Sequence, residues 1–453
     1  MNADSLKASS LEDIIRYFDS QKPLTPENKD EWDAFYTETD RGEIERIIVE
    51  FLYSSRGHKL LFGGHSGNGK STELNRLVND SRINDKFFIV KFDVKEILNI
   101  NDIEIVELFL VVCLKLLEFA DQNKIKIETY LEKEFKKLEG FFQDTLKIES
   151  QSSSSIQTSM GVEGKISAKA GFPLVRLAAA FYAKMSGQYE SRKIVRETYR
   201  ARLGELFNLI NDLLININTS GQQKDSLIII DGLDRIPFKQ AKRLFVEDGQ
   251  NLAMIREASI LMTVPISIIH SPDSALLENI IGPIKTLKNI RLKAKDGSQD
   301  SITDKNRGII KRVVCARLKN NNENGGLITP EALELAVNYS GGVFRTIIDL
   351  VASAAINSKV LGGTKIAEKD MNDAVNEARI KKKRPLNRTH WDILMEIHEN
   401  NEFLTEMDEE RLELLHGLFA LEYINGEEWY EVNPLLIENV KEYRQKYKKP
   451  AEI

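Results

Sequence analysis

The stretch from Lys59 to Leu77 reads KLLFGGHSGNGKSTELNRL, and it decides the fold. Its first residues, Lys59 to Phe62, are mostly apolar and predict a short buried strand. The motif G-x-x-x-x-G-K-S follows, and the residues from Thr72 to Val78 have helical spacing. Strand, glycine-rich loop and helix in this order are typical of a loop that binds phosphate.

The residue types of this loop predict how it would hold a nucleotide. Glycines let the backbone turn tightly, so that several N–H groups point at one phosphate, and the helix N-terminus adds partial positive charge. Lys70 would reach the β- and γ-phosphates of ATP, and Ser71 would offer its hydroxyl to Mg²⁺. A glycine-rich turn that binds nothing is the alternative. The expected contacts are Gly64, His65, Ser66, Gly67, Asn68, Gly69, Lys70, Ser71 and Thr72.

A second motif, LIIIDGLDRIP at 227–237, runs from apolar residues into a carboxylate. The continuous apolar run predicts a strand buried on both faces, with Asp231 at its exit. A phosphate-binding loop needs a second oxygen ligand for its Mg²⁺, supplied from the end of a neighbouring parallel strand. We therefore expect Ser71 and Asp231 to hold the metal. A helix cap at the strand exit is the alternative for Asp231.

The composition is that of an ordinary soluble protein. The chain has 453 residues, enough for two to four domains, with 42% hydrophobic and 29% charged residues. Cys113 and Cys315 both lie in apolar helical patterns and form no disulfide framework, so a reducing cytoplasm is expected. Charges interrupt the longest apolar stretches, which argues against a membrane role. A net charge of -6 argues against broad coating of nucleic acid.

At this point the sequence resembles the AAA+ and STAND groups of P-loop ATPases. The nearest shapes are bacterial STAND and KAP-type ATPases and the archaeal origin-recognition initiators. ASILMTVPISII at 258–269 is similar to the strand that carries the "sensor 1" residue, here Thr263. GGVFR, ending at Arg345, matches the "sensor 2" pattern of the helical lid. The segment 37–52 is similar to the one that folds over adenine.

The resemblance implies roles for these residues. Thr263 would orient the attacking water or contact the γ-phosphate, and Arg345 would reach the phosphates from the lid; a plain strand threonine and a surface arginine are the alternatives. Arg41 has the characteristic position near the adenine. Many AAA+ proteins place glutamate where this chain has Gly232, so water positioning falls to Asp234. With no clear arginine finger, slow turnover is expected, which suits a nucleotide-controlled switch.

The fold class expected is α/β: a three-layer P-loop NTPase core, an AAA+-like helical lid and a C-terminal winged-helix domain. The Asn425-Gly426 pair between LEYI and EEWYEV predicts the hairpin of the wing. The return of the insertion, 190–217, predicts one long amphipathic helix. The predicted domains are an N-terminal helical extension at 1–36, the core at 37–290 with an insertion at about 122–218, the lid at 291–380 and the winged helix at 386–453.

The insertion 165–202 is basic, with interleaved aromatic residues, so nucleic acid is a possible partner there. A solvated helix face or an acidic protein partner is the commoner alternative. The winged helix is acidic, which favours protein docking over DNA. The basic residues are Lys165, Lys169, Arg176, Lys184, Arg192, Lys193, Arg196, Arg200 and Arg202.

Three functions stay open at this point. The first is a regulatory ATPase whose nucleotide state controls homo-oligomerisation and engagement of a protein effector, as the resemblance implies for ATPases of bacterial anti-phage defence. The second is an ATP-gated DNA-binding initiator or loader. The third is a kinase that transfers phosphate to an acceptor other than water, although no acceptor-binding group of residues is visible in the sequence.

Overall fold

The computed structural model of the protein describes residues 6–39, 41–134, 136–137, 189–220, 224–319 and 326–447. The serine-rich run at 150–159, the hairpin suggested by VEGKISAKAGF and the basic residues from Lys165 to Lys184 lie outside the described residues.

A five-stranded parallel sheet forms the centre of the protein, in the order β2-β3-β4-β1-β5. Its register aligns Asp93 with Asp231 and Phe62 with Thr263. We expected Asp231 on the strand next to the glycine loop, and this was wrong: β4 lies between β1 and β3. The strands are β1 (Lys59–Gly63), β2 (Phe87–Asp93), β3 (Asp225–Asp231), β4 (Ala258–Thr263) and β5 (Ile284–Thr286).

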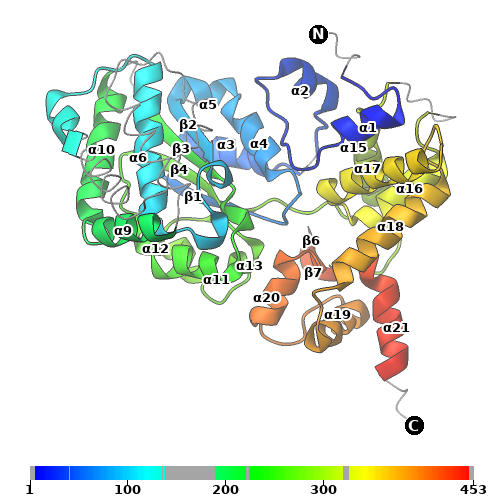
Figure 1. The fold of residues 1–453 in the computed structure, drawn as a ribbon. Coiled ribbons are helices and arrows are strands. Elements are labelled where there is room, and N and C mark those ends of the chain that lie inside the picture. Colours follow the sequence, from blue (N-terminus) through cyan, green and yellow to red (C-terminus); the bar gives the residue numbers. More distant parts are fainter. Residues whose placement is uncertain are drawn as a thin grey trace, which may run out of the picture.

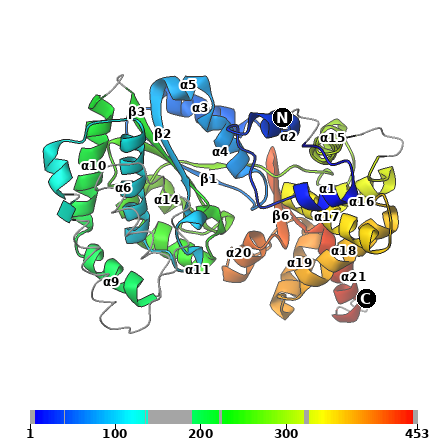
Figure 2. The same cartoon turned by 45° about the horizontal axis from the view of Figure 1, so that its top comes forward.

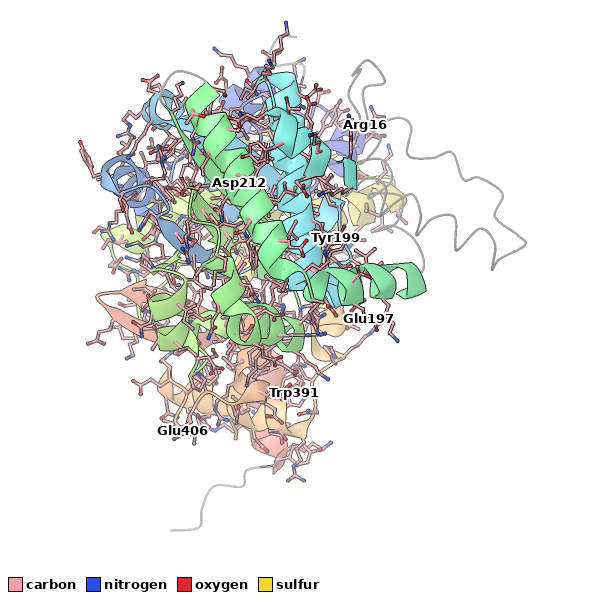
Figure 3. All side chains as sticks on the ribbon, turned by 90° about the vertical axis from the view of Figure 1, so that its left-hand side faces the viewer. Arg16, Glu197, Tyr199, Asp212, Trp391 and Glu406 are labelled. Carbon is pink, nitrogen blue, oxygen red and sulfur yellow. The ribbon has the colours of Figure 1, made fainter. Side chains whose placement is uncertain are left out.

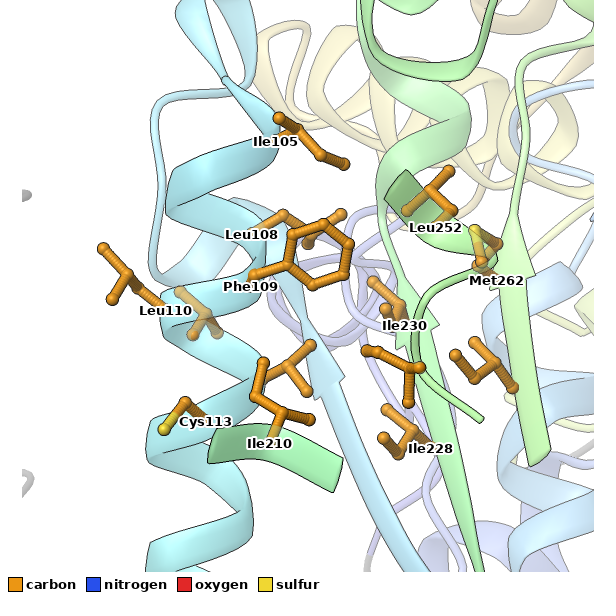
Figure 4. Packing of buried hydrophobic residues seen from close by; sticks show 14 of the residues in the cluster. Ile105, Leu108, Phe109, Leu110, Cys113, Ile210, Ile228, Ile230, Leu252 and Met262 are labelled. Carbon is orange, nitrogen blue, oxygen red and sulfur yellow. The ribbon is translucent and has the colours of Figure 1, made fainter. Parts of the chain in front are cut away.

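Helices cover both faces of this sheet, because alternate residues of its strands enter two separate cores. Leu227 and Ile229 of β3 pack with the helices that surround the loop. Ile228 and Ile230 pack with the opposite layer (Figure 4), where the ring of Phe109 meets Phe207 edge-on at 4.7 Å. The first layer has α3 (Glu43–Tyr53), α4 (Lys70–Val78) and α5 (Ser81–Lys86); the second has α6 (Ile105–Gln122), α9 (Tyr189–Arg200) and α10 (Leu203–Ser220).

Short helices complete the core, which is the three-layer α/β arrangement predicted. They follow the carboxyl ends of the strands or connect one strand to the next. They are η2 (Val94–Glu96), η3 (Ile100–Asp102), η4 (Leu233–Arg235), α11 (Phe238–Ala241), the π-helix η5 (Lys242–Glu247), α12 (Gly249–Leu252), α13 (Ile266–Ile269) and α14 (Ser274–Ile280).

A helical lid with its own hydrophobic core lies beside the sheet (Figure 1). Helix α1 of the N-terminal segment packs on α17, and its residues Leu11 and Ile14 enter the core of the lid. The helices of the N-terminal segment are α1 (Leu11–Tyr17) and α2 (Lys29–Phe35). The helices of the lid are α15 (Ser301–Cys315), α16 (Pro330–Ser340), α17 (Phe344–Val360) and α18 (Glu368–Lys383).

The C-terminal domain combines three helices with a two-stranded antiparallel hairpin. The hairpin turns at Gly426, whose φ is 78°, as the Asn-Gly pair predicted. Ile266 of the sheet core packs into the hydrophobic core of this domain. The elements are α19 (Arg388–Asn400), α20 (Glu409–His416), β6 (Ala420–Asn425), β7 (Glu427–Val432), η6 (Pro434–Leu436) and α21 (Ile437–Tyr447). Within the described residues, every helix is too short or too polar to cross a bilayer.

The expected long helix at 190–217 is in fact two helices, with a bend at Ala201 and Arg202. Figure 3 looks onto this side of the protein, where Glu197 and Tyr199 lie near the bend. The two helices follow different partners: α9 contacts α6, whereas α10 packs along both α6 and β3. A single straight helix could not follow both directions.

Two arginines of the basic run 165–202, where nucleic acid was a possible partner, are buried and offer it no surface. Arg192 Nε lies 2.9 Å from Glu107 Oε1, and Arg196 Nη2 lies 3.0 Å from Glu107 Oε2. Asp102 and Glu104 complete the cluster. The side chains of Arg192 and Arg196 are only 6% and 7% exposed. These arginines therefore fasten α9 to the start of α6.

Replacing Arg196 with methionine should lower the free energy of unfolding by about 3 kcal/mol, because buried acids lose a cation. Denaturant unfolding measures the change. Lys193→Met is the control, since that side chain is 59% exposed and its partner is an exposed glutamate. Equal stability of both variants would contradict the structural role of the cluster.

Candidate nucleotide site

The glycine loop links β1 to α4 in a conformation that needs glycine. Gly64, Gly67 and Gly69 have φ values of 123°, 83° and 90°. At Gly64 a Cβ would lie 2.6 Å from the carbonyl oxygen of Leu287, so backbone would have to move. The loop therefore turns tightly and delivers the chain into the first turn of α4, as a phosphate-binding loop must.

Lys70 opens α4, and its amine is buried against three oxygens. Nζ donates to the carbonyls of Gly64 at 2.7 Å and His65 at 2.9 Å, and it lies 2.8 Å from Oδ2 of Asp234. Burial would raise the pKa of the Asp234 carboxyl, but the charge and hydrogen bond of Lys70 lower it overall. Asp234 is therefore an anion held at the position where a phosphate would meet the lysine.

Oxygen ligands gather beside α4 at the ends of β2 and β3. Asp231 is 1% exposed, and its Oδ1 accepts the N–H of Gly232 at 2.8 Å. The hydroxyl of Ser71 lies near the same carboxylate. Burial raises the pKa of Asp231, and the charge of Lys91 opposes this. A Cβ on Gly232 would lie 2.2 Å from Oδ1 of Asp93, so a third oxygen is adjacent.

This donor set fits Mg²⁺, which prefers hydroxyl and carboxylate oxygens. The position of Asp93 also explains why a residue without a side chain stands at position 232. A side chain at that position would have to displace the carboxylate of Asp93 and would be strained at a φ of 86°. Whether Asp231 and Ser71 bind the metal stays a prediction.

Thr263 and Arg345 both lie close to the loop and the β3 turn, although in different ways. The hydroxyl of Thr263 is fully buried and accepts the N–H of Leu233 at 3.0 Å, so it supports the turn that carries Asp234. Arg345 donates from Nη1 to Ser66 Oγ at 2.9 Å. Its Nε is buried and has no hydrogen-bond partner among the described residues. The residue as a whole lines the cavity beside the loop.

Arg41 lies behind the loop, whereas the resemblance placed it near the base. Its Nη1 donates to the carbonyls of Asn68 at 2.9 Å and Lys288 at 3.3 Å, and its guanidinium faces the ring of Phe344 at 5.4 Å. It does not line the cavity described next. Arg41 thus ties the loop to the exit of the sheet core and to the lid.

A cavity extends from the loop between the N-terminal segment and the lid. Lys70, Ser71, Asp234 and Arg345 line it, together with the N-terminal segment at 19–24 and 35–37 and residues of α15 and α17. All lining residues are Asp19, Ser20, Gln21, Lys22, Pro23, Leu24, Phe35, Tyr36, Thr37, Gly67, Gly69, Lys70, Ser71, Thr72, Glu73, Asp234, Arg235, Val313, Arg317, Phe344, Arg345 and Ile348.

The C-terminal hairpin contacts the loop directly. Nε2 of His65 accepts the backbone N–H of Glu422 in β6 at 2.7 Å. Burial lowers the pKa of His65 to about 3, and the charge of Lys70 acts in the same direction, so the ring is neutral and can accept. The carboxylate of Glu422 pairs with His270 at 3.4 Å. One residue of the hairpin therefore joins the glycine loop to the helix that follows β4.

The junction of core, lid and hairpin converges on Gly341. Its carbonyl accepts hydrogen bonds from Asn289 Nδ2 at 3.0 Å and from the Tyr423 hydroxyl at 2.9 Å. Gly341 and Gly342 have φ values of 59° and 76°. A Cβ on Gly342 would lie 1.7 Å from the carbonyl oxygen of Ile290. The start of the lid is therefore packed too closely for larger residues.

Sequence reasoning missed three parts of this site. Asp93 ends a strand without any motif, and only its pairing with Asp231 in the sheet places it at the site. The loop at 19–24 is far from any motif, and Asn75 Nδ2 holds it by donating to Leu24 at 2.7 Å. The side chain of His65 contacts another domain, which no local pattern could indicate.

No protein-family model and no curated protein matches the sequence. The chain is similar to solved structures of Drosophila ORC bound to DNA, with 10% identity over 97% of this chain and 93% of that chain and a TM-score of 0.37. It is also similar to the ORC2 protein of Aeropyrum pernix in ADPNP and ADP complexes, with 12% identity over 95% of this chain and 98% of that chain and a TM-score of 0.42. A third similar structure is Cdc6p of Pyrobaculum aerophilum, with 12% identity over 92% of this chain and 99% of that chain and a TM-score of 0.35. The residues of the site, and not these likenesses, indicate what it can bind.

Proposed function

We propose that the protein is a regulatory ATPase of the AAA+/STAND type, which binds ATP with Mg²⁺ and hydrolyses it slowly. The glycine loop and Lys70 would hold the triphosphate, and Ser71 with Asp231 would hold the metal, which neutralises phosphate charge when bound. Arg345, which lines the same cavity, would complete the anion site from the lid with its guanidinium. The buried oxygens around α4 and the two cations beside the loop support this assignment.

The observation that carries the regulatory part is the contact of the glycine loop with the lid and with the C-terminal hairpin. Arg345 N–H donates to the carbonyl of Gly67 at 3.1 Å, and His65 accepts from Glu422. A phosphate that enters the loop displaces Lys70 from Asp234 and shifts the balance of these contacts. Nucleotide state would thus set the positions of lid and C-terminal domain, and with them self-association and engagement of a protein partner.

The experiment is ATP binding and hydrolysis with Mg²⁺, with the mass of the particle measured with and without nucleotide. A shift in mass that depends on ATP supports the proposal. Unchanged mass together with no hydrolysis would refute it. The burial of Arg192 and Arg196 takes two residues from the basic run 165–202, on which the DNA-gated alternative depended.

Replacing Asp234 with asparagine should leave ATP binding intact or tighter, because Lys70 loses its internal anionic partner. Hydrolysis should fall by about tenfold to a hundredfold, since the carboxylate that would position water is gone. Fluorescence titration and phosphate release measure the two quantities. The control is Asp225→Asn at the opposite end of β3, where the side chain pairs with exposed Arg56. Normal hydrolysis by the Asp234 variant would show that another residue positions the water.

A further inference from the structure

His270 lies between two carboxylates of the C-terminal hairpin. The residue directly follows α13 of the sheet core, and Figure 2 shows β6 of the hairpin between this core and the lid. His270 Nε2 lies 3.4 Å from Glu422 Oε2, and its Nδ1 lies 3.8 Å from Glu428 Oε1. The side chains of His270 and Glu422 are only 11% and 5% exposed. Within the described residues, the ion pairs of both glutamates are with this histidine and with no lysine or arginine.

Tyr430 determines which nitrogen of His270 carries a proton. Its hydroxyl donates its one proton to Glu428 and lies 3.3 Å from Nδ1 of the ring. The hydroxyl can therefore only accept from the ring, so Nδ1 is the protonated nitrogen. In the neutral ring Nε2 is then an acceptor, and it faces the acceptor oxygens of Glu422 without hydrogen-bond geometry to any described residue. Two buried acceptors that face each other need a cation between them.

The spacing of these groups suits a metal ion. One ring nitrogen of His270 and one oxygen from each of Glu422 and Glu428 lie within 4.8 Å of one another. Ligands of a tetrahedral Zn²⁺ ion lie about 2.1 Å from the metal and therefore about 3.4 Å apart. The Nε2 atom and the Glu422 oxygen already have this separation, and Glu428, which is 47% exposed, has room to move toward the ion. An imidazole among the ligands favours Zn²⁺ over Mg²⁺ or Ca²⁺, which prefer oxygen alone.

We propose that His270, Glu422 and Glu428 bind one Zn²⁺ ion, with water in the remaining position. The hydroxyl of Tyr430 would hold the ring in place by accepting from Nδ1, as the neighbour of a metal-binding histidine does. The ion joins the core, through His270, to both strands of the hairpin. The backbone N–H of Glu422 donates to His65 of the glycine loop, so the metal also keeps the hairpin against that loop. The site shares no residue with the Mg²⁺ site predicted beside α4.

The test is isothermal titration of the metal-free full chain with Zn²⁺, in millimolar Mg²⁺ so that the predicted Mg²⁺ site is filled. One Zn²⁺ should bind per chain. Glu428→Gln should weaken binding by about a hundredfold, and Tyr430→Phe, which keeps all three ligands, by about tenfold. The first variant should fold normally, because the side chain of Glu428 is half-exposed. The matched control is Glu427→Gln on the same strand, where the side chain is exposed and Zn²⁺ affinity should stay as in wild type.

Thermal unfolding distinguishes a metal ion from a proton at Nε2 of His270. Zn²⁺ should raise the melting temperature of wild type and of Glu427→Gln, and EDTA should reverse the change, whereas Glu428→Gln should respond little. A melting temperature that depends on pH but not on Zn²⁺ would show that only a proton binds, and would overturn the inference. Equal Zn²⁺ affinity in the two glutamate variants, or loss of binding in Asp231→Asn, would also overturn it. Each of these results leaves the proposed ATPase function standing.

Discussion

Lys70→Ala should reduce nucleotide affinity by a hundredfold or more, about 3 kcal/mol, and should bring ATP hydrolysis to background. The amine is buried and donates to two loop carbonyls, and among the described residues the other lysine that lines the cavity is Lys22 of the N-terminal segment. Isothermal titration with ATP and Mg²⁺ and a phosphate-release assay measure the two losses.

The same substitution also has a folding consequence, because it leaves Asp234 buried without its ion-pair partner. We expect the single variant to be less stable, and the double variant Lys70→Ala with Asp234→Asn to recover stability but not binding. Lys224→Ala is the control: this lysine is near the start of β3, and its Nζ donates to the exposed carbonyl of Asn84. Wild-type affinity in a folded Lys70→Ala protein would refute the phosphate site.

Gly342→Ala should lower the free energy of unfolding by about 4 kcal/mol. Two effects add: alanine is strained at a φ of 76°, and its Cβ would meet the carbonyl oxygen of Ile290, which is backbone and cannot rotate away. Denaturant unfolding measures the loss, which we expect to begin with release of the lid from the chain segment that leaves the sheet core.

Gly362→Ala is the matched control for this prediction. Its φ is 74°, but a Cβ there meets nothing within 4 Å, so only the cost of the left-handed backbone, about 1 kcal/mol, should be seen. The difference between the two variants then measures the close approach alone. Equal losses would mean that the junction at Ile290 adapts, contrary to the packing described above.

Local patterns in the sequence were sufficient for the parts of the protein that local physics determines. The loop between Lys59 and Val78, the buried strand ending at Asp231 and the hairpin at Gly426 each follow from residues within one short segment. The three-layer core with a lid and a C-terminal hairpin domain also agrees with prediction. Turn chemistry, apolar runs and helical spacing are properties of neighbouring residues, and they determine the same local structure in the folded protein.

The parts that were missed depend on contacts distant in sequence. The position of β4 between β1 and β3 is set by pairing across the whole sheet. A basic helix such as α9 has the same pattern whether it faces water or, as Arg192 and Arg196 do, buried acids. The cavity beside the glycine loop combines 19–24 with α15 and α17, which are separated by most of the chain. No residue pattern within one segment contains this information.

The double hydrogen bond at the Gly341 carbonyl has a mechanical consequence. Asn289 and Tyr423 are both buried. If the lid rotated away from either residue, that residue's donor would lose the Gly341 carbonyl and would find no water to accept its hydrogen bond. The amide of Leu287, two residues before Asn289, is bound to Gly63 of β1 at 2.9 Å. Lys288 between them is held as well, because its carbonyl accepts a hydrogen bond from Arg41 at 3.3 Å, so the lid and the hairpin can leave the sheet core only by breaking several buried hydrogen bonds together.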